Sequence, residues 1–148
     1  MTSVEEALLR RSKIVMEAVS WLSTPYRHQA STKGQGADCL GLVRGVHRAL
    51  LGQEPEVPPP YRPSPRLWGG DEPLLSAASR HLIATEEPRQ GDVLLFRLHR
   101  HAPVSHCGIL VDTDQFIHAY QGRGVIITAF APYWRRRLVA AFSFPETP

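Results

Sequence analysis

The start of the chain alternates apolar and polar positions with the period of an α-helix. Ser3 and Glu6 form a capping-box pattern, and the apolar residues that follow at helical spacing are Val4, Leu8, Val15, Ala18 and Leu22. The Ser-Thr-Pro sequence at 23–25 then stops the pattern. A first helix is therefore predicted between residue 3 and residue 22.

The helical period disappears after Gly52. The stretch 53–70, QEPEVPPPYRPSPRLWGG, holds six prolines and can form neither a long helix nor a central strand. We expect it to cross the surface as an extended connector. Helical spacing returns at 73–84, PLLSAASRHLIA, which predicts a further helix.

From residue 92 onward, short apolar runs with the period of β-strands follow one another. Five runs are separated by polar or glycine-containing turns: DVLLFRL, SHCGILV, QFIHAY, GVIITAF and LVAAFSF. Such a series is typical of an antiparallel meander. Because the helices precede the strands, the predicted fold class is α+β, a single domain over residues 1–148 with N-terminal helices packed on a five-stranded antiparallel sheet.

The composition is that of a folded globular protein. Apolar residues make up 43% of the chain and charged residues 21%, which argues against global disorder. No apolar run is long enough to span a membrane and the N-terminal segment lacks the features of a signal peptide, so we expect cytoplasmic synthesis and no membrane partner. The net charge of +3 suits an anionic polymer such as cell wall, but the one dense cluster, Arg135-Arg136-Arg137, is interpreted as a solvated face and not as a nucleic-acid site.

One of the two cysteines lies where a loop becomes a helix. In the stretch GADCLGLVRGVHRALLG, Asp38 is a suitable N-cap, so Cys39 lies in the first turn of a second helix. Val43, Val46 and Leu50 fall on the same helix face and direct the sulfur toward the core. Unpaired N–H groups and the helix dipole favour a thiolate there. Considered alone, such a cysteine is more often a small buried apolar residue.

A catalytic role for Cys39 requires a base and an orienting group, and two predicted strands carry histidines, His106 and His118. The loop between those strands decides whether the two imidazoles face the same way. A two-residue turn pairs His118 with Ile109 and places the histidines on opposite faces. A three-residue loop pairs His118 with Gly108 and places both on one face, with the glycine leaving room between the rings.

The three-residue loop is the one that forms a site. It brings both histidines to the sheet face on which the second helix presents Cys39, and it needs a left-handed residue that Asp114 can supply. Cys107 then points to the other face. We therefore predict that Cys107 is a packing residue outside the site.

These segments resemble the NlpC/P60 family of papain-like cysteine peptidases, which cut bacterial cell-wall peptides. DCLGLV is similar to the family's Asp-Cys-Ser-Gly-Leu-Val helix start, GDVLLF to its first strand, SHCGILV to its His-Val-Gly-Ile-Tyr strand and FIHA to the strand of its third catalytic residue. The resemblance implies that Cys39 is the nucleophile, His106 the general base and acid, and His118 the group that orients His106. It also implies roles at the oxyanion or the substrate for Tyr26, which matches the family's Pro-Tyr motif, and for Asp38.

The resemblance further implies a papain-like fold and a reaction. The expected reaction is hydrolysis of peptidoglycan stem peptides at the bond between γ-D-glutamate and diaminopimelate, through a thioester and without a cofactor or metal. The proline-rich connector and the ending WRRRLVAAFSFP look closest to members from prophages and gene transfer agents. That likeness implies tail proteins as partners and a particle-associated enzyme that acts in the periplasm. Leu40 in place of the family's serine, and Gln29-Ala30 in place of its Gly-Gly, concern substrate recognition.

Other interpretations remain open. The metal-ligand residue types of the strand region are His99, His101, His106, Cys107 and His118. Their spacing matches no standard zinc pattern, and neighbours on a strand face opposite ways, so a metal site is disfavoured. A tail component that binds cell wall without catalysis and a papain-like amidase or acyltransferase stay as alternatives, because the same fold carries several chemistries.

Overall fold

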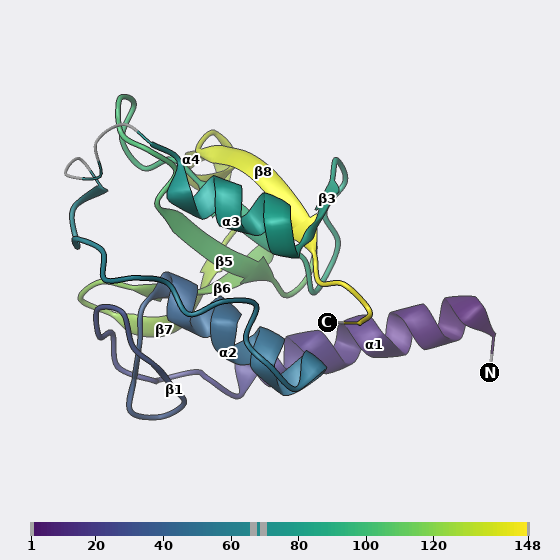
Figure 1. Cartoon of the computed structure of the whole chain (residues 1–148). Coiled ribbons are helices and arrows are strands. Elements are labelled where there is room, and N and C mark those ends of the chain that lie inside the picture. The colour runs from purple at the N-terminus through teal and green to yellow at the C-terminus, as the bar shows by residue number, and fades with distance from the viewer. Residues whose placement is uncertain (1, 66–67, 69–70, 148) are drawn as a thin grey trace.

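The structure is a computed structural model that describes residues 2–65, 68 and 71–147 (Figure 1). Along the chain the elements are α1 (Ser3–Val19), β1 (Ser31–Thr32), β2 (Gly36–Ala37), α2 (Cys39–Leu51), α3 (Pro73–His81), β3 (Ile83–Thr85), β4 (Val93–Phe96), β5 (His106–Leu110), β6 (Gln115–Tyr120), β7 (Gly124–Ala129), α4 (Pro132–Arg135) and β8 (Leu138–Ser143). Helices on one sheet make this an α+β fold, as the sequence predicts. No helix in the described part of the chain is long and apolar enough to cross a membrane.

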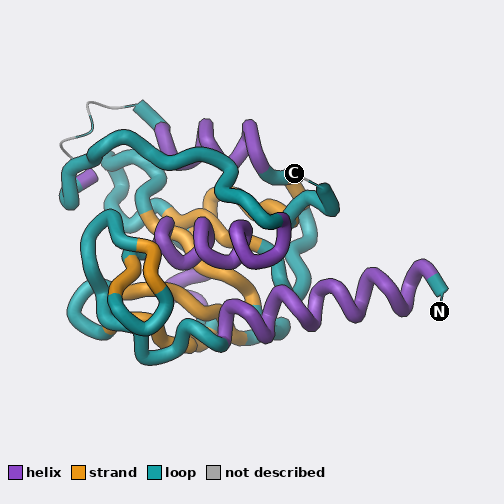
Figure 2. Tube along the Cα trace, turned by 60° about the horizontal axis from the view of Figure 1, so that its bottom comes forward, coloured by secondary structure: helices purple, strands orange, loops and turns teal. Residues whose placement is uncertain are grey.

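The first helix is capped by Thr2 and not by Ser3. The Thr2 side chain accepts a hydrogen bond from the Glu5 backbone N–H at 3.1 Å, so the predicted capping box of Ser3 with Glu6 is wrong by one residue. The first turns of α1 extend beyond the body of the molecule (Figure 2). Further along, Arg11 forms a 2.8 Å ion pair with the buried Asp92, which fixes α1 against the start of β4.

The helices α1 and α2 lie side by side (Figures 1 and 2). Their close approach depends on Gly45, because a Cβ at this position would lie 2.1 Å from Cζ2 of the buried Trp21. The second helix begins at Cys39 with Asp38 as N-cap, as predicted, and ends at Gly52 with a φ of 79°.

The main sheet has six strands in the order β3-β8-β4-β5-β6-β7. The prediction of five strands in a simple meander is therefore corrected in two ways. The predicted helix 73–84 ends at His81, and its last residues form the edge strand β3. The final strand β8 does not follow β7 but returns to pair with β4 on the other side, where it buries Ala141 and Phe142.

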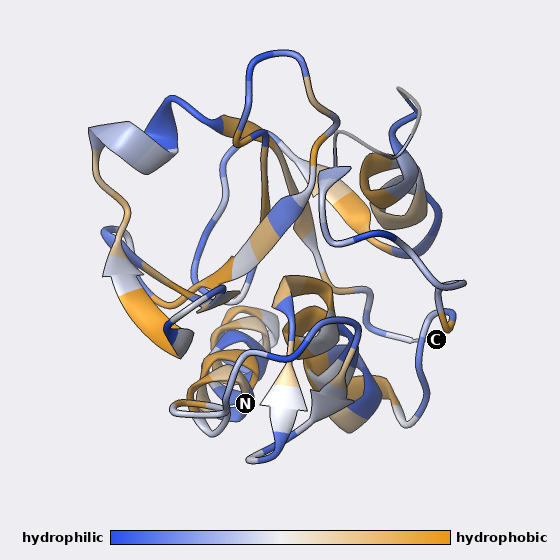
Figure 3. Cartoon of the chain, turned by 90° about the vertical axis from the view of Figure 1, so that its left-hand side faces the viewer, coloured by the Kyte–Doolittle hydropathy of each residue, from blue (hydrophilic) through white to orange (hydrophobic). Residues whose placement is uncertain are grey.

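Each face of the sheet has its own apolar core. On the face covered by α1, α2 and α3 the buried strand residues are Val93, Leu95, Cys107, Ile109, Ile117, Ala119, Val125 and Phe142. On the opposite face an aromatic cluster forms around the short helix α4, with Phe96, Phe116, Phe130 and Trp134. The strands carry much of the strong hydrophobic colour in Figure 3, as expected for a sheet buried on both faces.

The proline-rich connector runs past the start of α2 and has no α-helix or strand in its described residues, in agreement with the sequence; positions 66, 67, 69 and 70 lie outside the described residues. Ion pairs hold its two ends. Glu54 pairs with Arg44 and Arg48 of α2. Glu72 pairs with Arg97 at 3.0 Å and also accepts the Val104 N–H at 2.8 Å. These contacts fix the connector as one wall of a cleft.

Candidate active site

Asp38 joins the start of α2 to the preceding loop. One carboxylate oxygen accepts the Gly41 N–H at 2.7 Å, and the other accepts the Gln29 N–H at 2.8 Å. Gln29 has a φ of 62°, a left-handed conformation at a position where the family pattern has glycine. The loop and the helix start are thereby locked together, and the Cys39 thiol is held partly exposed at the first helical position.

The loop between β5 and β6 has three residues. Ile109 pairs with Ile117, Leu110 pairs with Phe116, and the Val111 N–H donates to the Gln115 carbonyl at 2.9 Å. The connection is therefore 112–114, and His118 lies opposite Gly108, as the three-residue alternative predicts. Asp114 does not take a left-handed φ, because Ser23 and Gln29 are the only non-glycine residues with positive φ among those described. That detail of the prediction is wrong.

The two histidines meet on one face of the sheet. Nε2 of His106 lies 2.7 Å from Nδ1 of His118, a hydrogen-bond distance between buried side chains. The space between the strands is tight, since a Cβ on Gly108 would lie 3.1 Å from the His118 Cβ and 2.8 Å from the Phe116 ring. The odd number of residues in the loop and the absence of a side chain at Gly108 together permit the contact between the two imidazoles.

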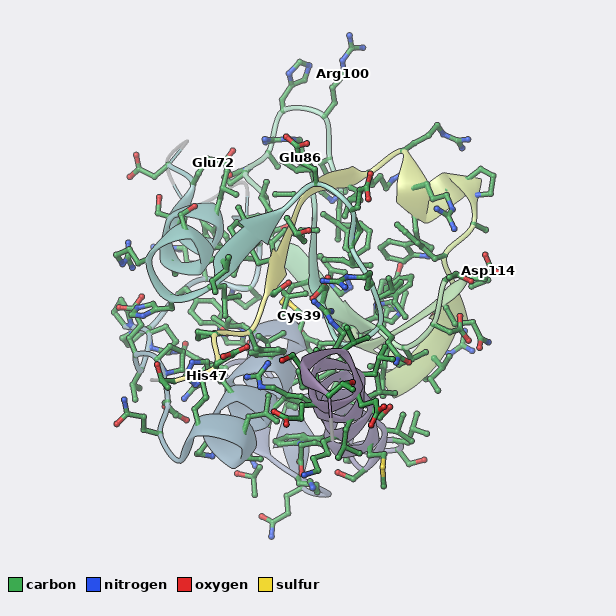
Figure 4. All side chains as sticks on the ribbon, turned by 90° about the vertical axis from the view of Figure 1, so that its right-hand side faces the viewer. Cys39, His47, Glu72, Glu86, Arg100 and Asp114 are labelled. Carbon is green, nitrogen blue, oxygen red and sulfur yellow. The ribbon has the colours of Figure 1, made fainter. Side chains whose placement is uncertain are left out.

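The face on which the histidines lie differs from the expected one. Their imidazoles pack in the aromatic cluster, with the Trp134 ring 5.6 Å from His106 and 5.2 Å from His118, and so lie on the α4 side of the sheet. Cys39 comes from the helical side. Cys39 and His106 nevertheless line the same cleft, and His106 is the first residue of β5, at the end of that strand. Figure 4 places Cys39 between the helices and the sheet.

Burial in the aromatic cluster keeps His118 neutral. Desolvation, and to a smaller extent the charge of His106, lower the pKa of His118 to about 3. Its second nitrogen, Nε2, lies 2.8 Å from the Thr128 hydroxyl oxygen on β7. Both ring nitrogens of His118 are therefore satisfied inside the protein.

The position of Cys107 corrects the sequence-based prediction. Cys107 does point away from His106, but the helical face to which it points is the face from which Cys39 arrives. A hydrogen bond from the Cys107 thiol, followed by a hydrogen bond to His106 and its positive charge, holds the pKa of Cys39 well below its usual range, although burial opposes this shift. The same hydrogen bond and burial raise the pKa of Cys107. Cys107 is therefore both a packing residue and a neighbour of the thiolate.

A cleft of about 700 Å³ opens in front of Cys39 and His106. Tyr26 and Asp38 line it, as do residues of the connector and of α3. Burial, and then the negative charge of the Cys39 thiolate, raise the pKa values of both Tyr26 and Asp38. The Tyr26 phenol therefore stays protonated, and able to donate a hydrogen bond, at neutral pH.

Two contacts of this site have no clear signal in the sequence. The Tyr61 hydroxyl, from the proline-rich connector, donates to Asp38, and burial followed by this hydrogen bond raises the pKa of Tyr61. The Ser105 carbonyl oxygen lies 3.7 Å from the Cys39 sulfur and can accept its S–H only when Cys39 is protonated. Thr128 could have been found, because it lies two residues from the partner of His118 in the β6–β7 pairing and so on the same face.

The five residues of the strand region whose side chains could bind a metal do not form one cluster, although His106 and His118 are in contact. Cys107 and His106 face opposite sides of β5, and His101 is exposed on the loop before it. Figure 4 shows Arg100 at the tip of this loop, pointing away from the protein. Among the residues that the structure describes, no three His, Cys, Asp or Glu side chains form a group that could hold a metal ion.

Comparison with known proteins shows the family of the chain. The model of the NlpC/P60 family matches residues 23–143, a segment that contains Tyr26, Asp38, Cys39 and both histidines. The chain belongs to the NlpC/P60 family. Among solved structures, the NlpC/p60 domain of the peptidoglycan hydrolase SagA matches 90% of this chain and 98% of its own with a TM-score of 0.64 at 24% identity, which confirms the NlpC/P60 fold.

Two of the curated relatives have different names. The murein DD-endopeptidase MepS/murein LD-carboxypeptidase of Escherichia coli is 32% identical over 128 residues, which is 86% of this chain and 59% of that protein. The gamma-DL-glutamyl hydrolase of Bacillus subtilis is 28% identical over 132 residues, 88% of this chain and 29% of that protein. This chain thus spans about three-fifths of the first relative and less of the second.

Proposed function

We propose that this protein is a cysteine peptidase that hydrolyses the stem peptides of peptidoglycan. The observation that carries the proposal is the 2.7 Å contact between His106 and His118 at the end of the sheet where α2 presents Cys39. This contact supports Cys39 as the nucleophile, His106 as the base and His118 as the orienting group of thioester chemistry. The names of the relatives support peptidoglycan as the substrate.

Within this proposal each group has a role. His106 uses Nδ1 toward Cys39, because its Nε2 is taken by His118. The thiolate attacks the scissile carbonyl, and the oxygen that becomes negative is stabilised by the Cys39 N–H at the helix start and by the Tyr26 phenol. His106 then gives its proton to the leaving amine, and water releases the acyl group from sulfur with His106 as base.

Among the bonds of the stem peptide, we propose that the enzyme cuts the one between γ-D-glutamate and diaminopimelate. The gamma-DL-glutamyl hydrolase name among the relatives supports it, whereas the DD-endopeptidase name supports a cross-link between stem peptides. Mass analysis of the fragments released from purified peptidoglycan distinguishes the two bonds. It also distinguishes an acyltransferase, which would attach an added amine to the acyl fragment in place of water.

The test of catalysis is the substitution Cys39→Ala. Removal of the nucleophile is expected to lower hydrolysis by about 10⁶-fold. His106→Ala should have an effect of the same size, and His101→Ala, at an exposed histidine outside the site, serves as the matched control. Circular dichroism shows whether each variant is folded. Hydrolysis at the wild-type rate by a folded Cys39→Ala protein would refute the cysteine-peptidase assignment, and cell-wall binding without fragment release by the wild type would favour the non-catalytic tail component.

We further propose that the enzyme acts from a phage tail or gene transfer agent particle, with tail proteins as partners and with its substrate in the periplasm. The likeness of the connector 53–70 and of the chain ending to members from such particles supports this location. Mass spectrometry of purified particles tests it. Absence of the protein from particles that carry the other tail proteins would refute the location without touching the peptidase assignment.

A further inference from the structure

We propose that Thr128 is a positioning residue, which acts through His118 to set the proton arrangement that keeps Cys39 as a thiolate. This inference rests on the proposed cysteine-peptidase function but concerns a residue outside the triad. It is carried by an unbroken chain of side-chain contacts. Nε2 of His106 lies 2.7 Å from Nδ1 of His118, and Nε2 of His118 lies 2.8 Å from Oγ1 of Thr128.

His118, the third group of the triad, can accept a hydrogen bond from His106 in only one of its two tautomers, whereas a carboxylate would always accept. A neutral imidazole has one N–H and one bare nitrogen, and the two tautomers reverse which nitrogen donates. When Cys39 is a thiolate and His106 is an imidazolium, both nitrogens of His106 carry protons. His106 must then donate through Nε2, so Nδ1 of His118 must be bare and must accept.

The single proton of neutral His118 therefore has to lie on Nε2. Because His118 is completely buried, this N–H needs an acceptor inside the protein, or its desolvation is not compensated. The Thr128 hydroxyl oxygen is that acceptor. The opposite tautomer would direct a proton from His118 toward Nε2 of His106 and would prevent the imidazolium from forming.

The surroundings of Thr128 allow three substitutions to test the role of its hydroxyl. Thr128 and His118 both line a second groove, on the α4 side of the sheet, which also contains Tyr120, Tyr133 and Trp134. The groove is open to solvent, so water can reach the space that a smaller side chain leaves. A side chain of equal size without a hydroxyl would instead keep water out and offer no acceptor.

We therefore expect the alkylation rates of the variants to depend on whether a hydrogen-bond acceptor for Nε2 of His118 remains, and not on the size of the side chain at position 128. Thr128→Val replaces the hydroxyl with a methyl group and should slow alkylation of Cys39 by a haloacetamide about tenfold, which corresponds to about 1.4 kcal/mol. Thr128→Ala admits a water molecule and should lose less. Thr128→Ser keeps the hydroxyl and should recover most of the wild-type rate. Thr85→Val, on the edge strand β3, is the matched control for the loss of a strand threonine.

Alkylation measures the thiolate directly and needs no peptidoglycan. If the wild-type cysteine reacts readily with the reagent but no peptidoglycan fragment is released, the proposed substrate is wrong while the role of Thr128 can still be measured. Nitrogen NMR of histidine-labelled protein reports the tautomer of His118, with the proton expected on Nε2 in the wild type and redistributed to Nδ1 in Thr128→Val.

Equal alkylation rates for wild type and Thr128→Val would overturn the proposal. So would an order in which Thr128→Ala loses more than Thr128→Val, because that order follows side-chain packing. An unchanged His118 tautomer in Thr128→Val would overturn it as well, even if the rate had fallen.

Discussion

The Cys107 thiol should control how readily Cys39 ionises. The neighbouring Cys107 thiol makes the largest contribution to the lowered pKa of Cys39, because a thiol beside the sulfur can donate a hydrogen bond to the thiolate. Its own raised pKa keeps it protonated and able to donate. Cys107→Ala removes this donor, leaves the neighbouring histidine in place, and should therefore raise the pKa of Cys39.

The size of the effect follows from the chemistry of the bond. Hydrogen bonds to charged groups contribute about 1.5–3 kcal/mol net, and a thiol is a weak donor, so the lower end of this range applies. About 1.4 kcal/mol corresponds to one pKa unit. At a pH below both pKa values, the thiolate fraction of Cys107→Ala should thus fall about tenfold, and alkylation of Cys39 should slow by the same factor.

The assay is the rate of alkylation of Cys39 by a haloacetamide as a function of pH. Cys107→Ser keeps a donor and should stay near the wild-type midpoint. Ile109→Val, which removes one methyl group from the next buried residue on the same face of β5, controls for lost packing. Coincident midpoints for Cys107→Ala and the wild type, in folded proteins, would refute the role of Cys107.

Two further outcomes follow from the histidine pair. The pKa of His118 is lowered from an ordinary value of 6.5 to about 3, so between these pH values the unfolded chain binds a proton at His118 and the folded protein does not. The free energy of unfolding should therefore fall by up to about 1.4 kcal/mol per pH unit as the pH decreases from 6.5 toward 3. Urea unfolding over this range should show a flatter dependence for His118→Asn, and equal slopes would contradict the assigned cause. Gly108→Ala would place a Cβ 2.8 Å from the Ile117 carbonyl oxygen and 3.1 Å from the His118 Cβ, so it should destabilise the protein by about 1–3 kcal/mol and lower peptidoglycan hydrolysis. Denaturant unfolding and hydrolysis measured together test this, and a variant with wild-type stability and activity would show that the strands can separate at no cost.

Local patterns in the sequence predicted the start of the site well. Asp38 is a suitable N-cap by residue type, and it caps α2 in the structure. The pairing of His118 with Gly108 follows from the odd length of the loop 112–114, because side chains alternate along a strand. The cap depends on residues a few positions apart, whereas the length of the loop was one of two alternatives and was decided by the structure.

The same local patterns misplaced elements whose position depends on distant partners. LVAAFSF was correctly recognised as a strand, but its place beside β4 is decided by which sheet edge buries its apolar residues. The residues at 83–85 continue the spacing of a helix, yet they pair with β8 as an edge strand. Helix propensity is a weak preference that the added strand pairing overrides.

The sequence by itself thus determined the types of residue at the site and limited the two histidine strands to two registers, because cap chemistry and strand alternation act over short distances. Only the tertiary structure decided that Tyr61 reaches Asp38, that Cys107 lies beside the thiolate and that the imidazoles are buried against Trp134. These contacts join segments tens of residues apart or opposite faces of the sheet. Their formation depends on how the whole chain buries its apolar surface, and no short stretch of sequence specifies that arrangement.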